Sequence, residues 1–231
     1  FDLDIIANYS VALTLSAAMG ILLTINWSAY GPRLKKEFSI GKYDLAKKTL
    51  NYYFHEILFQ LIICLLFMIF FLKFIFGILA PDYYEHITIY FFLILCSVHI
   101  FRFPTLVCEQ ILFNFDRNHS IFLYKLLLFV IFLVIVYPLM KIINFYAIPV
   151  SYLFAYFLLF IFMYYDVKKY SFLILDFKKV SIPLILLFLF LLLEVINLYF
   201  IIDTYYLLID VIQFTFLAIS CLLYYFWFIS R

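Results

Sequence analysis

Ionisable side chains inside long apolar stretches are the residues of this sequence best placed to do chemistry. A charge at the centre of a membrane helix costs on the order of 2.5–3.5 kcal/mol, so such residues usually serve a pathway or a structural pair. His99, Arg102 and Glu109 are spaced to lie on one helical face, and Pro104 between them can free a carbonyl group. This set predicts a positive site for a phosphate in a water-filled cavity. An internal Arg102–Glu109 pair that only locks helices together is the alternative, and His99 alone fits an interhelical hydrogen bond.

A second polar cluster lies near the end of the sequence. Glu194 and Asn197 are close in one apolar stretch, and Asp210 and Gln213 are close in the next. Glu194 and Asp210 could form a relay for protons or cations. Hydrogen bonding between the two helices, with one carboxyl group protonated, is the simpler interpretation.

The first apolar stretch carries the most hydroxyl, amide and small side chains, Asn8, Ser10, Thr14, Ser16, Thr24, Asn26, Ala12, Ala17, Ala18 and Gly20. Such a helix either packs tightly against its neighbours or lines an aqueous cavity. Both interpretations predict that it lies inside the bundle, away from lipid.

The elements that position these residues are predicted to be transmembrane helices. Hydrophobic residues make up 69% of the sequence, and the mean hydropathy is +1.14. A helix needs roughly 20 mostly apolar residues to cross the hydrocarbon core. Seven stretches qualify, Ile5–Ser28, Phe54–Leu79, Ile87–Leu112, Ile121–Met140, Ile148–Tyr165, Val180–Ile202 and Tyr205–Ile229. Because lipid offers backbone groups no partner, each must be helical, and the fold class predicted is an all-α polytopic membrane protein.

The placement of charge predicts the topology. Nearly every Lys and Arg falls in every second gap between the stretches, at 33–48, 117, 168–179 and the C-terminal Arg231. Positive charge is retained on the cytoplasmic side. The sequence therefore predicts that residues 1–4 lie outside and that the C-terminus is cytoplasmic.

The longest gap, residues 30–53, is predicted to be a basic cytoplasmic loop holding a short interfacial helix. Its Lys pairs alternate with apolar residues, which favours contact with anionic lipid. Three ionisable residues near the predicted cytoplasmic ends of helices, His55, Glu56 and Lys125, are expected to extend toward the membrane surface.

The sequence carries no signature of an enzyme. It has no nucleophile elbow, no zinc-protease motif and no phosphate-binding loop, and it contains only 4 Gly. The 4 Cys lie inside apolar stretches without metal-ligand spacing, so neither a metal nor a cofactor is predicted. A net charge of +2 gives no indication of a nucleic-acid partner.

Several short motifs, in order, resemble polysaccharide flippases of the multidrug/oligosaccharidyl-lipid/polysaccharide exporter superfamily. The similarity covers most of residues 5–160, and two features depart from it, Ala7 in place of a usual glycine and the absence of the glycine-rich segment after residues 137–139. The motifs are Asn8-Tyr9-Ser10-Val11-Ala12, Pro32-Arg33-Leu34, residues 41–48, Phe76-Gly77, Pro81-Asp82-Tyr83-Tyr84, Asn114-Phe115-Asp116-Arg117 and Tyr137-Pro138-Leu139.

The resemblance implies the second lobe of a two-lobe, alternating-access transporter. Residues 1–165 would form the second-lobe bundle of five helices, and residues 166–231 two additional helices. The first lobe would be missing from this chain. The implied function is to flip a polyprenyl-diphosphate-linked oligosaccharide across the plasma (inner) membrane of a bacterium, for cell-surface polysaccharide such as O-antigen.

The resemblance also implies roles for individual residues. Arg102 would attract the diphosphate, with His99 on the same face, and Glu109 would tune or gate it. The sugar would contact Asn8 and Thr14. The partners would be membrane lipid, the lipid-linked oligosaccharide and the missing lobe.

Other functions remain alternatives. A drug or cation antiporter of the same superfamily needs a carboxylate at the cavity centre, where this sequence has Arg102. A membrane glycosyltransferase or polysaccharide polymerase generally needs a large soluble loop, and a structural subunit would need no membrane-embedded charge.

Overall fold

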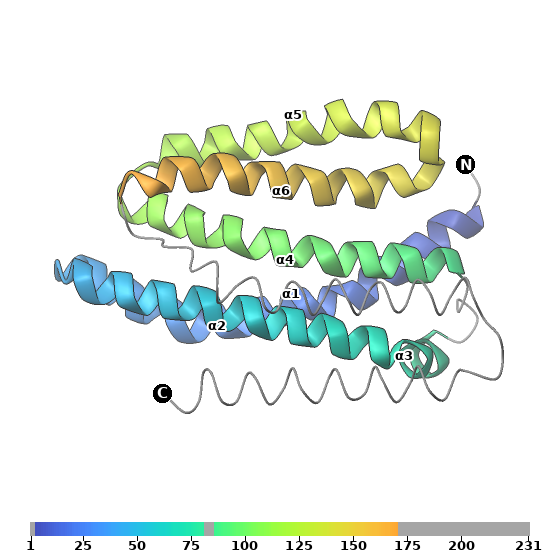
Figure 1. Ribbon diagram of the computed structural model, residues 1–231, viewed down its shortest axis with the longest axis horizontal. Helices are drawn as coiled ribbons and strands as arrows, with labels where there is room; N and C mark the ends of the chain where they lie inside the picture. The colour runs from blue at the N-terminus through green and yellow to red at the C-terminus, as the bar shows by residue number, and fades with distance from the viewer. Residues whose placement is uncertain (1–2, 81–85, 171–231) are drawn as a thin grey trace.

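The computed structural model describes residues 3–80 and 86–170, and these residues form helices without any strand (Figure 1). The predicted all-α class is therefore confirmed for them. The stretches Val180–Ile202 and Tyr205–Ile229, with Glu194 and Asp210, lie outside the described residues. The elements are α1 (Leu3–Ser39), α2 (Tyr43–Phe70), α3 (Leu72–Leu79), α4 (His86–Asn114), α5 (Asn118–Ile143), the 3-10 helix η2 (Asn144–Tyr146) and α6 (Ala147–Lys168).

Four segments of the described chain are long and apolar enough to cross a membrane, Leu3–Ser39, Tyr43–Phe70, Thr88–Asn114 and Asn118–Lys168. The last segment contains α5, of 26 residues, and α6, of 22 residues. Each of these two helices exceeds the roughly 20 residues that a crossing needs. The architecture is that of a membrane-embedded helical protein.

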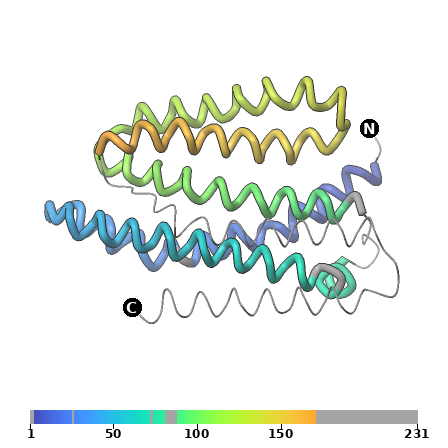
Figure 2. The backbone as a smooth tube through the Cα atoms, in the orientation of Figure 1, coloured from blue at the N-terminus to red at the C-terminus, as the bar shows by residue number. Residues whose placement is uncertain are grey.

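The long helices lie side by side with their turns at two ends of the bundle (Figures 1 and 2). The α1–α2 turn, the α4–α5 turn and the end of α6 lie at one end. The start of α1, the short helix α3 and η2 lie at the other end. As a result, α1 and α4 run in the same direction, opposite to α2 and α5. The two tight turns of the first end use left-handed backbone, with φ of 71° at Gly41 and 56° at Asp116.

The predicted loop of residues 30–53 is much shorter in the structure. Helix α1 continues through Pro32 to Ser39, and the helix expected to lead into the second span is the first part of α2, which begins at Tyr43. The continuation is held by packing, because Leu34 and Phe38 are buried in the same core as the transmembrane part. Apolar residues that suggested contact with a membrane surface instead extend two long helices.

The second predicted span is interrupted. It was expected to run to Leu79, but α2 ends at Phe70 and a separate helix, α3, begins at Leu72. The change of direction at Phe71 lets the fully buried Phe76 ring meet Phe92 of α4 edge-on, with ring centroids 5.6 Å apart. Edge-to-face aromatic pairs stabilise such contacts.

Helix α4 is the centre of the packing. It contacts α1, α2, α5 and α6, and in Figure 1 it lies between the α1–α2 pair and the α5–α6 pair. Phe103 of α4 stacks on Phe54 of α2, with ring centroids 5.7 Å apart. Helix α5 is outermost and has no buried residue. The central position of α4 places its polar residues at several helix interfaces.

Candidate functional site

Asn8 and Thr88 join α1 and α4 near the end of the bundle that holds the start of α1. The hydroxyl of Thr88 donates a hydrogen bond to Oδ1 of Asn8 at 2.9 Å, and both residues are buried. Buried hydrogen bonds between membrane helices fix their register. The structure therefore gives Asn8 an interhelical contact. Asn8 does not line either of the two pockets described below.

The same two helices approach closely near their middle, at Gly20 and His99. A Cβ atom added at Gly20 would lie 3.4 Å from Cε1 of His99. The Nδ1 atom of His99 is buried, and within the described residues it has no hydrogen-bond partner. The interhelical hydrogen bond that the sequence suggested for His99 is not formed by this atom.

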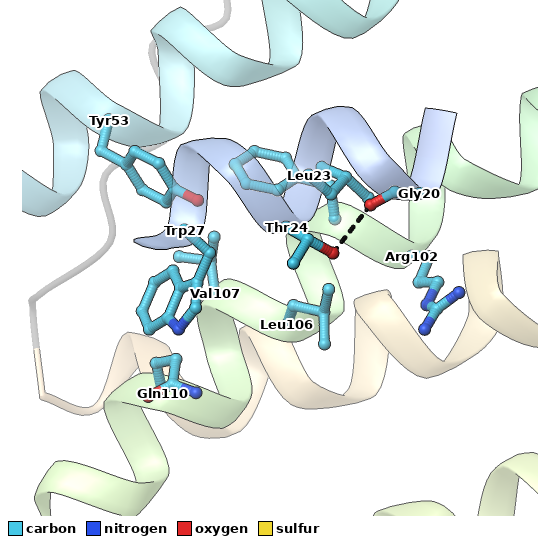
Figure 3. A pocket seen from close by; sticks show the side chains of 10 residues that line it. Gly20, Leu23, Thr24, Trp27, Tyr53, Arg102, Leu106, Val107 and Gln110 are labelled. Atoms are coloured by element: carbon cyan, nitrogen blue, oxygen red, sulfur yellow. Dashed lines mark hydrogen bonds between the residues drawn. The ribbon is translucent and has the colours of Figure 1, made fainter. Parts of the chain in front are cut away.

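A pocket of about 190 Å³ opens beside this contact, between α1, α2 and α4 (Figure 3). Arg102 lies at one end of the labelled residues, and Trp27 and Gln110 lie together at the other end. Most of the remaining labelled residues lie between these ends, with Gly20 near Arg102 and Tyr53 near Trp27; the full set is Gly20, Leu23, Thr24, Tyr53, Leu106 and Val107. Arg102 is exposed, and no hydrogen bond or ion pair within residues 3–80 and 86–170 engages its guanidinium.

A second pocket, of about 390 Å³, shares Trp27 and Gln110 with the first. It extends along the same two helices to Lys35 of α1 and Asn114 of α4. We call the two pockets together the α1–α4 groove. The groove thus leads from Arg102 to the end of the bundle that carries the α1–α2 turn.

Glu109 does not pair with Arg102. Its Oε1 atom accepts a hydrogen bond from Nζ of Lys125 on α5, and the two groups form an ion pair. The alternative of an Arg102–Glu109 lock is therefore wrong. Lys125 engages Glu109 while its own side chain stays 52% exposed. His99 faces α1 while Glu109 reaches α5, so the predicted trio divides between two interfaces.

Within residues 3–80 and 86–170, helix α1 is only partly covered. One stripe is buried, and the opposite stripe is exposed. The exposed stripe, spaced to lie on one helical face, consists of Ser10, Thr14, Ala17, Ile21, Thr24 and Ser28. Thr14 donates its hydroxyl hydrogen bond to the carbonyl of Ser10 at 2.9 Å. Thr24 and Ser28 also line the groove, so the stripe joins it.

His55 and Glu56 also depart from expectation, because both take part in contacts within the bundle. His55 is buried, with Nδ1 at 2.7 Å from the carbonyl oxygen of Asn51. Glu56 accepts a hydrogen bond from the hydroxyl of Tyr30 at 2.6 Å. The Tyr30–Glu56 bond ties α2 to α1 close to the groove, whereas the His55 contact lies within α2.

One end of the bundle gathers most of the positive charge of the described chain. The α1–α2 turn and its flanks carry Lys35, Lys36 and Lys42, the α4–α5 turn carries Arg117, and α6 ends at Lys168. Beyond α6, the hydrogen bond from Lys169 to Asp166 raises the pKa of Lys169. The basic residues that alternate along the sequence therefore gather at one end of the described bundle.

Sequence reasoning missed Trp27 and Gln110 as pocket residues. Neither residue is charged, so neither stands out in an apolar stretch. The spacing of Arg102, Leu106 and Gln110, each four residues apart, places all three on one face of α4 and could have found Gln110. Trp27 could be found only from the contact of α1 with α4.

In comparisons with protein-family models, curated proteins and solved structures, nothing matches this chain. The functional argument therefore depends on the groove and its residues.

Proposed function

We propose that this chain is the second lobe of an alternating-access flippase that moves a polyprenyl-diphosphate-linked oligosaccharide across the plasma membrane of a bacterium. The observation that carries the proposal is the guanidinium of Arg102. It lines the α1–α4 groove without a partner among the described residues. The product is cell-surface polysaccharide of the O-antigen type.

The chemistry of Arg102 favours an anionic substrate. Guanidinium is always charged, and its planar donors match the oxygens of a phosphate in a bidentate arrangement. A charge kept at membrane depth without an internal partner is costly. A diphosphate headgroup entering the groove would supply the missing anion.

The exposed stripe of α1 supports an aqueous passage beside the groove. Five of its six side chains are hydroxyls or alanine and only Ile21 is large and apolar, although a lipid-facing helix gains most from large apolar side chains. In the proposal this stripe faces the first lobe, and Thr14 contacts the passing sugar. Asn8, which bonds Thr88, supports that face from behind.

Topology completes the proposal. Because positive charge is retained inside, the end with the α1–α2 and α4–α5 turns is cytoplasmic. The groove then opens toward the cytoplasm, where such a substrate is made. In this proposal residues 1–165 are the five-helix bundle of the lobe. The two further crossings and the cytoplasmic C-terminus that the sequence predicts lie in residues 166–231, mostly outside the described residues. Glu194 and Asp210 remain candidates for coupling to an ion.

The pairing of Glu109 disfavours the cation-antiporter alternative. A carboxylate that binds a transported cation should be open to the pathway. Glu109 instead engages Lys125, and its side chain is only 15% exposed.

The test is to replace Arg102 in the intact protein, in the cell that makes it. Arg102→Ala should abolish surface polysaccharide while the amount of protein in the membrane stays normal, and Arg102→Lys should retain part of it. Arg117→Ala is the matched control, because it removes an exposed guanidinium at the α4–α5 turn. Normal surface polysaccharide in Arg102→Ala would refute the proposal.

A further inference from the structure

Trp27 is held in a fixed position at the junction of the two pockets. A Cβ atom at Gly31 would lie 3.0 Å from Cε2 and 3.1 Å from Nε1 of Trp27. Glycine at residue 31 therefore leaves room for the indole against the backbone of α1, and a larger residue would crowd it. On another side, the indole packs on Tyr53 of α2, with ring centroids 5.8 Å apart. Its half-buried ring lines both pockets.

Gln110 faces the same space from α4. Its side chain lines both pockets and lies beside Trp27 in Figure 3. Among the described residues, no hydrogen bond engages its side-chain amide, although its backbone carbonyl accepts one from Asn114 at 2.8 Å. The free amide offers two donors and an acceptor to a ligand.

An aromatic ring beside an unpartnered amide is the chemistry that binds a sugar. The face of an aromatic ring carries partial negative charge, and the apolar face of a hexose presents C–H groups to it. Hydroxyl groups at the edge of the hexose can exchange hydrogen bonds with an amide. Ligand pockets generally combine apolar walls with a few such polar groups.

We propose that Trp27 and Gln110 form a saccharide subsite of the α1–α4 groove, which binds the first sugar while Arg102 binds the diphosphate. The inference depends on the proposed function, because it names the groups that recognise the sugar part of that substrate. It moves the principal sugar contact from Asn8, which is buried against Thr88, to the groove itself. The positions of the residues fit this division, because Arg102 lies at the end of the first pocket opposite to Trp27 and Gln110.

The experiment is calorimetric titration of the intact protein in lipid nanodiscs with four probes. These are geranyl diphosphate and geranyl diphosphate linked to glucose, galactose or N-acetylglucosamine. At least one glycosylated probe should bind about tenfold more tightly than geranyl diphosphate, which corresponds to about 1.4 kcal/mol. Trp27→Leu and Gln110→Ala should each remove most of that gain and leave the affinity for geranyl diphosphate unchanged. Trp27→Tyr should keep most of it.

Two controls separate the subsite from the proposed function. Tyr165→Leu removes an exposed ring of α6 outside the groove and should change nothing. Arg102→Ala should weaken all four probes alike. If no sugar improves binding, or if the gain survives in both Trp27→Leu and Gln110→Ala, the subsite is refuted while diphosphate binding stands. If no probe binds at all, the proposed function fails and the subsite fails with it.

Discussion

The ammonium group of Lys125 on α5 donates a hydrogen bond to the carboxylate of Glu109 on α4. This pair joins the central helix of the bundle to the outermost one, which has no buried residue of its own. The Lys125 side chain is 52% exposed, whereas that of Glu109 is only 15% exposed. The pair therefore supplies the more buried carboxylate with a cation from the neighbouring helix.

Removing one partner of this pair should destabilise the protein. Glu109→Gln removes the anion that Lys125 engages, and we expect the free energy of unfolding to fall by about 1–3 kcal/mol. The double variant Glu109→Gln with Lys125→Met should recover most of the loss, because it leaves no unpaired charge. Thermal unfolding in nanodiscs measures the stability of the single and the double variant. Lys168→Met, at the exposed end of α6, is the control and should have no effect; a double variant no more stable than Glu109→Gln would contradict the explanation.

The close approach of α1 and α4 at Gly20 sets a limit on side-chain size. Gly20→Ala places a Cβ atom at an ordinary contact distance, 3.4 Å from His99, and should leave stability nearly unchanged. Gly20→Leu should force the helices apart and cost about 1–3 kcal/mol. Gly77→Leu provides the matched control, since nothing lies within 4 Å of a Cβ atom there. Equal unfolding temperatures for the two leucine variants would show that α1 and α4 do not pack as described.

The hydrogen bond between Thr88 and Asn8 should contribute modestly to stability. Thr88→Val keeps the shape of the side chain and removes its donor, and we expect a loss of about 0.6 kcal/mol, typical for such bonds in membranes. Thr14→Val removes an exposed hydroxyl that bonds only its own helix among the contacts described, so unfolding should be unaffected. When surface polysaccharide is measured in cells, Thr14→Val should have the larger effect and Thr88→Val the smaller one, because Thr14 faces the proposed passage. Loss of transport in Thr88→Val alone would place the sugar contact at Asn8 instead.

The position of Trp27 should depend on Gly31. In a Trp227→Phe background Trp27 is the remaining one of the 2 Trp residues in this sequence, and its fluorescence reports its surroundings. Gly31→Ala would crowd the indole, and we expect its emission to shift to longer wavelength as the ring moves into the groove. Gly41→Ala strains a turn with φ of 71° and should lower stability without a spectral shift. An unchanged spectrum in Gly31→Ala would show that the indole does not rest on this glycine.

The helices could largely be predicted from the sequence, but their partners could not. Length and apolarity found α4, α5 and α6 within a few residues, because lipid forces each crossing to be a helix. The same argument missed the end of α1, since Leu34 and Phe38 are buried by neighbours distant in sequence. Spacing placed Glu109 beside Arg102 on one face of α4 but could not reveal Lys125, which arrives from another helix.

The residues of the groove also show that contacts between helices could not be predicted from the sequence. Arg102 could be selected from its charge and depth alone. Trp27 and Gln110 join it only when α1 and α4 lie side by side, with the close approach at Gly20 and the Asn8–Thr88 bond among their contacts. No local pattern in either helix encodes that arrangement.

The central claim is that residue 102 faces a water-filled passage. The direct measurement introduces Arg102→Cys into the intact protein after Cys64, Cys96, Cys108 and Cys221 are replaced by serine, and follows labelling with a charged, membrane-impermeant thiol reagent. The reagent should label position 102, and geranyl diphosphate should protect it, whereas Leu133→Cys on the lipid-facing side of α5 should not be labelled. A position 102 that stays unlabelled from both sides of the membrane would contradict the account.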